Sequence, residues 1–133
     1  MLVNIDLQSE IPIYTQLVQQ IIEGIARKQL LPGEPLPSVR SLAADLGINL
    51  HTVNKAYHIL KQDGFVQINR KQGVVIHPDA FPPADEAYSD RLREQLRPLI
   101  AEAICRGMTN EQLIGLVEDG FAQFEVGEAK KDG

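Results

Sequence analysis

The sequence has one cysteine among 133 residues, so no disulfide can form within the chain. It also lacks any run of the ~18 to 20 apolar residues that a membrane-spanning helix needs. The first eight residues carry no cluster of Lys or Arg followed by an apolar stretch, so no secretion signal is expected. These absences predict a cytoplasmic protein with no membrane partner, in a compartment where thiols stay reduced.

Motifs of common enzymes are missing as well. The chain has no glycine-rich phosphate loop of Walker or Rossmann type, no HExxH and no GxSxG. His51 and His58 do not suggest a metal site, because seven residues span about 10.5 Å along a helix, too far for one ion. Cys105 is interpreted as a small core or interface residue. We therefore expect no enzyme activity, no catalytic residues, no metal and no cofactor.

The composition that remains is that of an ordinary globular protein, but its charge is unevenly divided. Hydrophobic residues make up 44% and charged residues 23% of the chain, which excludes a disordered protein, a collagen and a coiled-coil rod. Residues 1–78 hold seven Lys+Arg against six Asp+Glu, whereas residues 79–133 hold six against twelve. A more basic amino-terminal part is one indication of a domain that binds a polyanion.

Apolar periodicity predicts three helices in the first part. Pro12 suits a first helical position, and apolar residues at four-residue spacing continue that helix to about Gln29. After a proline-rich stretch, Ser38 is the predicted N-cap of a short helix that ends at Gly47. Asn49 is the predicted N-cap of the third helix. Two short helices therefore meet across a tight turn.

The period of the sequence changes after Gly64. Residues 65–68 and 74–76 are β-prone runs, and the connection 69–73 contains the Gly and Asn that a hairpin needs. An isolated hairpin is marginally stable in water, so this one should pack against the helices. The predicted fold class is mainly α with a small β-hairpin wing, as a winged helix-turn-helix domain over residues 1–78.

A second region is predicted beyond a stiff linker. Residues 79–85 contain consecutive prolines, which favour extended geometry, and the domain boundary is placed there. Residues 86–126 are predicted to form a two-helix dimerisation hairpin, in which Thr109 and Gln112 have the spacing of a capping box. Residues 127–133 are predicted to be a disordered tail.

The third predicted helix separates its residue types. Its apolar residues share one face, while short, donor-rich side chains lie elsewhere near its amino terminus, where they suit base edges and phosphates. The alternative is that they are only the solvated side of an amphipathic helix. These side chains are His51, Thr52, Asn54, Lys55 and His58.

Several short motifs stand together in this first part: Leu36-Pro37-Ser38-Val39-Arg40, Thr52-Val53, Ala56-Tyr57 and Gly64 with the apolar residues after it. Through them, residues 11–77 resemble the winged-helix DNA-binding domain of the GntR family of bacterial transcription regulators. The carboxyl-terminal part is too short for the large effector domains of most subfamilies and resembles the YtrA-like subfamily. The resemblance implies a sequence-specific regulator that is usually a repressor, acting on transport operons.

The resemblance also implies which residues contact DNA. Arg40 matches an arginine that grips DNA, and Thr52 matches a position that contacts phosphate. Leu50 and Asn54 stand where many members have arginine. The DNA sequence that this protein recognises should therefore depend less on bidentate contacts between arginine and guanine. The implied DNA-binding residues are Ser38, Arg40, Asn49, Leu50, His51, Thr52, Asn54, Lys55, Arg70, Lys71, Gln72 and Gly73.

The carboxyl-terminal helices carry more apolar surface than a two-helix hairpin can hide, so we predict a homodimer. Such a dimer would bind a double-stranded DNA operator with inverted-repeat symmetry. No motif identifies a small-molecule effector. The candidate interface residues are Leu92, Leu96, Leu99, Ile100, Ala103, Leu113, Val117, Phe121 and Phe124.

The rival interpretation is a winged helix that serves as a protein-interaction module without specific DNA binding. Such modules have an acidic or apolar recognition face, and this face is neither. Strong, salt-dependent retention on heparin or duplex DNA would separate the two classes.

Overall fold

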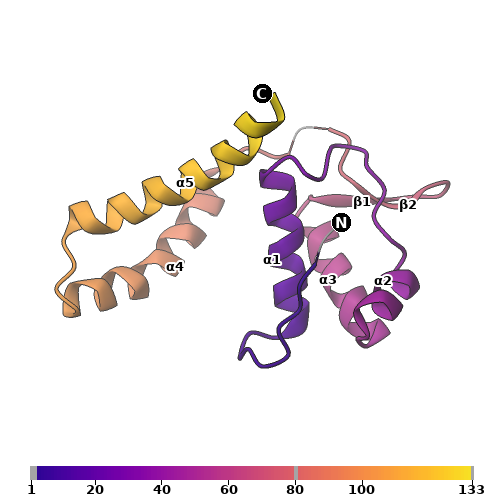
Figure 1. The fold of residues 1–133 in the computed structure, drawn as a ribbon, viewed down its shortest axis with the longest axis horizontal. Coiled ribbons are helices and arrows are strands. Elements are labelled where there is room, and N and C mark those ends of the chain that lie inside the picture. The colour runs from indigo at the N-terminus through magenta and orange to yellow at the C-terminus, as the bar shows by residue number, and fades with distance from the viewer. Residues whose placement is uncertain (1–2, 80, 133) are drawn as a thin grey trace. The chain divides into compact units, whose positions relative to one another are not determined.

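The computed structural model describes residues 3–79 and 81–132, and for residues 126–132 it describes the backbone alone. Within these ranges lie five helices and one two-stranded sheet, shown in Figure 1. The chain divides into two compact units, Met1–Phe81 and Pro82–Gly133. The predicted fold class, mainly α with a hairpin wing, is confirmed.

The first unit contains three helices followed by a β-hairpin. The helices are α1 (Ile13–Ala26), α2 (Val39–Leu46) and α3 (Leu50–Gln62). The hairpin consists of β1 (Val66–Asn69) and β2 (Gly73–Ile76). α3 packs against both α1 and α2, which is the arrangement of a helix-turn-helix supported by a preceding helix.

Side-chain caps fix the ends of α2 and α3. The Ser38 Oγ accepts a hydrogen bond from the Ser41 N–H at 3.0 Å, and the Asn49 Oδ1 accepts one from the His51 N–H at 2.8 Å. Gly47 follows α2 with φ +66°, a left-handed conformation in which a side chain would be strained. Both N-caps and the glycine C-cap lie where the sequence predicted them.

Replacing Ser38 with alanine should lower the free energy of unfolding by about 1 kcal/mol, because the Ser41 N–H loses its acceptor. Urea unfolding of the full chain, followed by circular dichroism, measures the change. Ser41→Ala, in the same exposed helical turn, is the matched control and should change stability by less than about 0.5 kcal/mol. Equal losses in the two variants would contradict the capping role.

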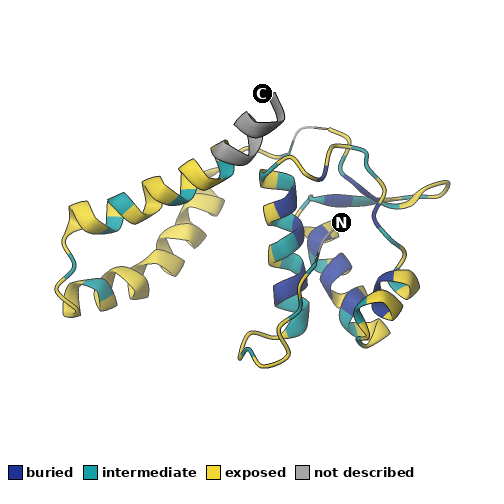
Figure 2. Cartoon of the chain, viewed as in Figure 1, coloured by how far each residue is buried: buried dark blue, intermediate teal, exposed yellow. Residues whose placement is uncertain are grey.

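The hydrophobic core of the first unit lies between α1, α3 and the sheet, as the dark residues in Figure 2 show. Leu17 and Ile21 of α1, Val53 and Leu60 of α3, and Ile76 of β2 are fully buried. Full burial of a side chain of this size contributes about 1.5 to 3 kcal/mol relative to exposure. The apolar face of α3 is therefore fixed inward, and its polar residues face outward.

The proline-rich segment before α2 is an additional extended element beside β2. The Gly33 N–H donates to the Ile76 carbonyl and the Ile76 N–H donates to the Glu34 carbonyl, each at 2.8 Å. The Leu36 N–H donates to the Val74 carbonyl, also at 2.8 Å. Prolines are compatible with an edge position, because the N–H that each lacks is not needed there. This pairing with β2 was not predicted from the sequence.

The hairpin turn is shorter than predicted. Asn69 lies opposite Gly73 in the antiparallel pairing, so three residues, 70–72, connect the strands instead of the expected 69–73. The Asn69 Oδ1 accepts hydrogen bonds from the N–H groups of Lys71 at 2.8 Å and Gln72 at 3.3 Å. The asparagine side chain closes the turn and allows the strands to extend by one residue each.

Two glutamines of α1 hold the amino-terminal segment of the chain. The Gln16 Oε1 accepts from the Asp6 N–H at 2.9 Å, and its Nε2 donates to the carbonyls of Asp6 at 3.0 Å and Ile11 at 2.8 Å. One turn later, the Gln20 Oε1 accepts from the Asn4 N–H at 2.8 Å and its Nε2 donates to the Asn4 carbonyl. Each carboxamide thus pairs with both backbone groups of one residue, as a neighbouring strand would. These bonds of Gln16 and Gln20, called the glutamine clamp below, were not predicted from the sequence.

The second unit contains α4 (Glu86–Cys105) and α5 (Asn110–Asp132). α4 continues through Pro98. The predicted capping box at the start of α5 is confirmed: the Gln112 N–H donates to the Thr109 Oγ1 at 3.1 Å, and the Thr109 N–H donates to the Gln112 Oε1 at 2.8 Å.

The tail predicted at 127–133 overlaps the end of α5, whose backbone reaches Asp132. The side chains of residues 127–132 and the whole of residue 133 lie outside the described part of the chain. The disordered tail therefore stays a prediction. Among the described residues, no helix combines the length and apolar character required to cross a bilayer.

Candidate nucleic-acid interface

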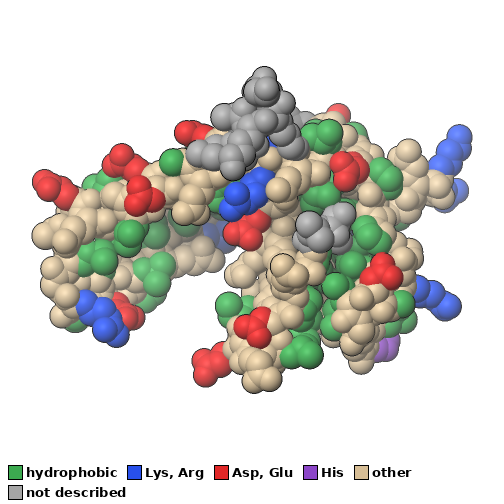
Figure 3. All heavy atoms as spheres, in the orientation of Figure 1, with side chains coloured by type: hydrophobic (Ala, Val, Ile, Leu, Met, Phe, Trp, Pro, Cys, Tyr) green, Lys and Arg blue, Asp and Glu red, His purple; other side chains and the backbone are tan. Residues whose placement is uncertain are grey.

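The predicted DNA-binding residues lie on three segments of the first unit: the start of α2, the start of α3 and the tip of the hairpin. All of them are exposed except Thr52, which is half-buried. Figure 3 shows Lys and Arg side chains beside α2 and at the hairpin tip, on the same edge of this unit. The fold therefore brings together side chains that are more than 30 positions apart in the sequence.

The two faces of α3 are separated as the sequence predicted. Val53, Ala56, Tyr57 and Leu60 are buried. The exposed side carries donors and one apolar group near the helix amino terminus, which is the end that a recognition helix directs at base edges. This exposed set consists of Leu50, His51, Asn54, Lys55 and His58.

Tyr57 connects α3 to the beginning of α2. Its hydroxyl donates a 2.7 Å hydrogen bond to the carbonyl of Pro37, the residue before the α2 N-cap. Burial raises the pKa of the Tyr57 phenol, so the group stays protonated and remains a donor. This bond fixes the position of Arg40, at the second residue of α2, relative to α3.

Asn49 caps α3, and this limits the hydrogen bonds that its side chain can make to a base. A bidentate contact to adenine uses both the oxygen and the nitrogen of a carboxamide. The Asn49 oxygen already accepts the His51 N–H. Asn54 is exposed one turn further along the helix and does not serve as its cap, so it is the better candidate for an adenine contact.

Lys55 has a partner that the sequence analysis missed. Its Nζ lies 4.0 Å from the centroid of the Tyr14 ring, a cation–π distance. Tyr14 stands in the first turn of α1 and packs partly against the core. Because the two residues are far apart in the sequence and on different helices, neither spacing nor periodicity could have indicated the contact. The ring holds the ammonium group at the edge of the candidate interface.

Tyr14→Leu should weaken operator binding by about two- to fivefold for each half-site, the effect of losing one exposed cation–π contact per protomer. Tyr14→Phe keeps the aromatic face and should bind as the unmodified protein does. In a Lys55→Met background the Tyr14→Leu change should have no further effect, because the cation is absent. Fluorescence anisotropy at fixed salt measures these affinities, and equal losses in the two backgrounds would contradict the coupling.

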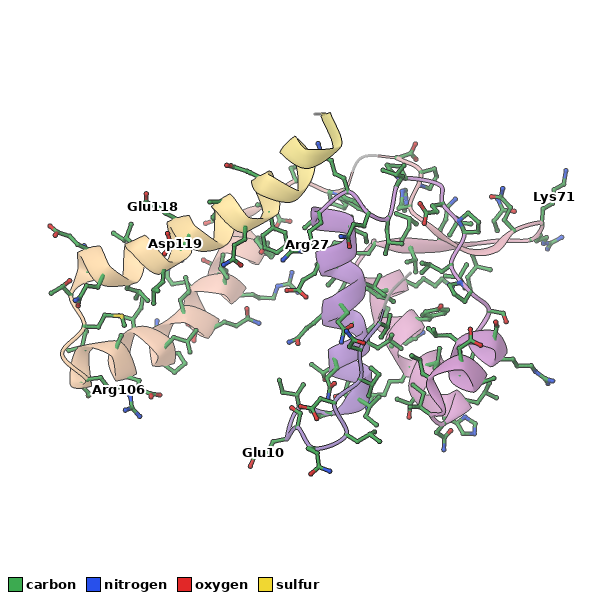
Figure 4. All side chains as sticks on the ribbon, in the orientation of Figure 1. Glu10, Arg27, Lys71, Arg106, Glu118 and Asp119 are labelled. Atoms are coloured by element: carbon green, nitrogen blue, oxygen red, sulfur yellow. The ribbon has the colours of Figure 1, made fainter. Side chains whose placement is uncertain are left out.

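The hairpin tip is a small cationic projection. Arg70, Lys71 and Gln72 are exposed, and Figure 4 shows the Lys71 side chain pointing away from the sheet. Asn69 shapes this turn through its two bonds to backbone N–H groups. A rigid turn that carries two cations is suited to contacts with phosphates or with the edge of a minor groove.

Other chemistry-bearing residues do not form a site. Within the described ranges, no three His, Cys, Asp or Glu side chains are placed to hold a metal ion. His51 and His58 are exposed on α3. Cys105 is exposed at the end of α4, so its interpretation as a core residue of the single chain is wrong. Its interpretation as an interface residue stays a prediction.

The candidate dimer residues lie on a largely exposed second unit. No residue of α4 is buried, and Leu99 and Phe121 keep 62% and 68% of their surface exposed. Ala103, Leu113 and Phe124 are half-buried. A shallow groove of about 450 Å³ runs along one side of α4, and its lining residues are Ser89, Leu92, Arg93, Leu96, Arg97 and Ile100.

Comparisons with known proteins agree with this geometry. The family model described as "Bacterial regulatory proteins, gntR family" matches residues 13–76. The chain is 34% identical over 126 residues to the HTH-type transcriptional repressor YtrA of Bacillus subtilis, which covers 95% of this chain and 97% of that protein.

Solved structures are similar over nearly the whole chain. A transcriptional antiterminator from Listeria monocytogenes has a TM-score of 0.84 at 26% identity, covering 93% of this chain and 92% of that one. YtrA from Sulfolobus acidocaldarius, a GntR-family transcription factor, has a TM-score of 0.56 at 36% identity, covering 91% and 97%. With the family match and the exposed helix-turn-helix, these similarities show that the chain belongs to the GntR family and is a YtrA-like DNA-binding transcription regulator.

Proposed function

We propose that the protein binds an inverted-repeat DNA operator as a homodimer and represses transcription from it. The observation that carries this proposal is the exposed, donor-rich edge formed by the starts of α2 and α3 and by the hairpin tip. The whole acidic excess of the chain lies in residues 79–133, away from this edge in the sequence. A polyanion is therefore the expected ligand.

In the proposed complex, α3 enters the major groove. Arg40 grips the DNA and Thr52 contacts a phosphate, and these contacts fix the register. Asn54 pairs with adenine, and Leu50, which is 41% exposed, contacts a thymine methyl group. The hairpin tip contacts DNA beyond the core half-site and responds to groove width more than to base identity.

The apolar surfaces of α4 and α5 support the homodimer. Side chains such as Leu99 and Phe121 are too exposed for a soluble monomer to retain without a partner. A twofold axis would cover this surface with its own copy and present two α3 helices to one face of the DNA. Both helices reach major grooves only if the half-sites are about 10 bp apart, or a multiple of it.

Repression is the outcome that the relatives favour, because YtrA of Bacillus subtilis is a transcriptional repressor by name. A dimer that covers two half-sites can exclude the transcription machinery from an overlapping promoter. Since bacterial DNA lies in the cytoplasm and the matching family is one of bacterial regulators, we place the protein in the cytoplasm.

Selection of bound sequences from a random duplex pool, followed by footprinting, tests the proposal. We expect an inverted repeat with half-sites about one turn apart, without a strict guanine requirement in each half. An asymmetric footprint or a direct repeat would contradict the twofold model. Binding without salt dependence, or no enrichment at all, would favour the protein-interaction module instead.

A further inference from the structure

Phe81 ends the first unit by packing onto its core. Its ring centroid lies 5.4 Å from that of Phe65, with 49° between the ring planes, a tilted arrangement that is favourable for aromatic pairs. Phe65 is itself fixed by the backbone, because its N–H donates to the Leu60 carbonyl and its carbonyl accepts from the His77 N–H, both at 2.9 Å. Phe81 falls in the linker predicted from the sequence at residues 79–85, but in the structure it belongs to the first unit and packs against its core.

The other end of the connection is fixed as well. The Asp85 Oδ1 accepts the Tyr88 N–H at 2.8 Å and caps α4. Between these two anchors lie only Pro82, Pro83 and Ala84. In the extended geometry that consecutive prolines favour, three residues span about 9 Å, at about 3.1 Å per residue.

Phe81 therefore sets the length of the tether. Without the ring contact, the next residue joined to the first unit is His77, whose N–H donates to the Phe65 carbonyl, and the tether becomes residues 78–84. Seven residues reach about 22 Å at the same rise. The gain of about 12 Å per protomer exceeds the ~3.4 Å that one extra base pair adds between two half-sites.

From these contacts we propose that Phe81 is a specificity-determining residue for half-site spacing. Its packing on Phe65 keeps the tether short and stiff, so that the two α3 helices of a dimer accept one spacing and reject its neighbours. This inference rests on the proposed function, because spacing has meaning only for a dimer that binds an inverted repeat.

The test measures affinity of the full chain for a set of operators that differ only in the number of base pairs between half-sites. For the unmodified protein we expect a preference of about tenfold or more for one spacing over spacings two base pairs away, comparable to one lost base-pair contact. In Phe81→Ala we expect this ratio to fall to about two- to threefold, because a longer tether absorbs the displacement and rotation.

Two further variants separate tether length from loss of folding. Phe81→Leu keeps an apolar anchor and should keep the spacing preference. An insertion of Gly-Ser-Gly between Pro83 and Ala84 leaves the core untouched and should relax the preference as Phe81→Ala does. A merely destabilised domain would instead lose affinity equally at every spacing.

The outcomes distinguish the two proposals. A sharp preference that survives both Phe81→Ala and the insertion, or a uniform loss of affinity in both, would overturn the role of Phe81. An unmodified protein that binds inverted repeats at all spacings equally would overturn it too. If the unmodified protein binds no inverted repeat, or binds as a monomer, the proposed function itself fails.

Discussion

Arg40→Ala should reduce operator affinity by roughly 30-fold or more, because a charged contact worth about 1 to 3 kcal/mol is lost in each half-site bound by the proposed dimer. The side chain is exposed at the second residue of α2, beside the Ser38 cap and the Tyr57 hydroxyl bond that fix its position. Fluorescence anisotropy with the selected operator measures the loss. Thermal unfolding should be unchanged within about 0.5 kcal/mol, as for most exposed substitutions.

The salt dependence of binding identifies the kind of contact that Arg40 makes. Loss of a phosphate contact in each half-site should reduce the slope of log K against log salt by about two. Arg106→Ala removes the same charge from the exposed end of α4, where Arg106 pairs with Glu102 at 2.7 Å, and should leave both quantities unchanged. Unchanged affinity in Arg40→Ala would mean that the protein does not dock on DNA as its family does.

Leu99→Glu should convert the proposed dimer to a monomer and lower operator affinity by about 100- to 10,000-fold, since the two half-sites would no longer be bound together. A carboxylate buried in an apolar interface without a partner is strongly unfavourable. In a free monomer, position 99 is exposed, so the carboxylate of the substituted side chain remains solvated there. Sedimentation at micromolar concentration measures the oligomeric state.

Ala101→Glu is the control for this substitution. Ala101 is exposed on the same helix but lies away from the stripe of Leu96, Leu99 and Ala103. It should leave the protein dimeric. If the unmodified chain sediments as a monomer at this concentration, or if Leu99→Glu remains a dimer, the interface on α4 and α5 is not the one proposed.

Features that depend on local chemistry could be predicted from the sequence. Ser38, Asn49 and Gly47 each act within one helical turn, as do Thr109 and Gln112, and all adopt the predicted roles. Caps and glycine C-caps have strong residue preferences, so a single position carries the signal. The order of the helices and the separation of the two faces of α3 could also be predicted, because the periodicity of apolar residues is a local pattern.

Features that depend on contacts distant in the sequence could not be predicted. Three contacts join residues that have no fixed spacing in the sequence. They are the cation–π contact of Tyr14 with Lys55, the Phe65–Phe81 ring pair, and the pairing of residues 33–36 with β2. Prolines next to a strand weaken its signal, and a cation–π pair leaves no periodic pattern. Cys105 is exposed, so only its interpretation as a core residue was wrong, because burial depends on contacts that this exposed helix does not make within the chain.

The glutamine clamp on α1 has a consequence for the dynamics of the amino-terminal segment. The amide hydrogens of Asn4 and Asp6 are held by the side chains of Gln20 and Gln16, and Gln16 is buried. In native-state hydrogen exchange, these amides should exchange more slowly than those of a free chain end, because each is released only when its own glutamine carboxamide detaches. The first turns of α1 and this segment should therefore open together, as one cooperative unit.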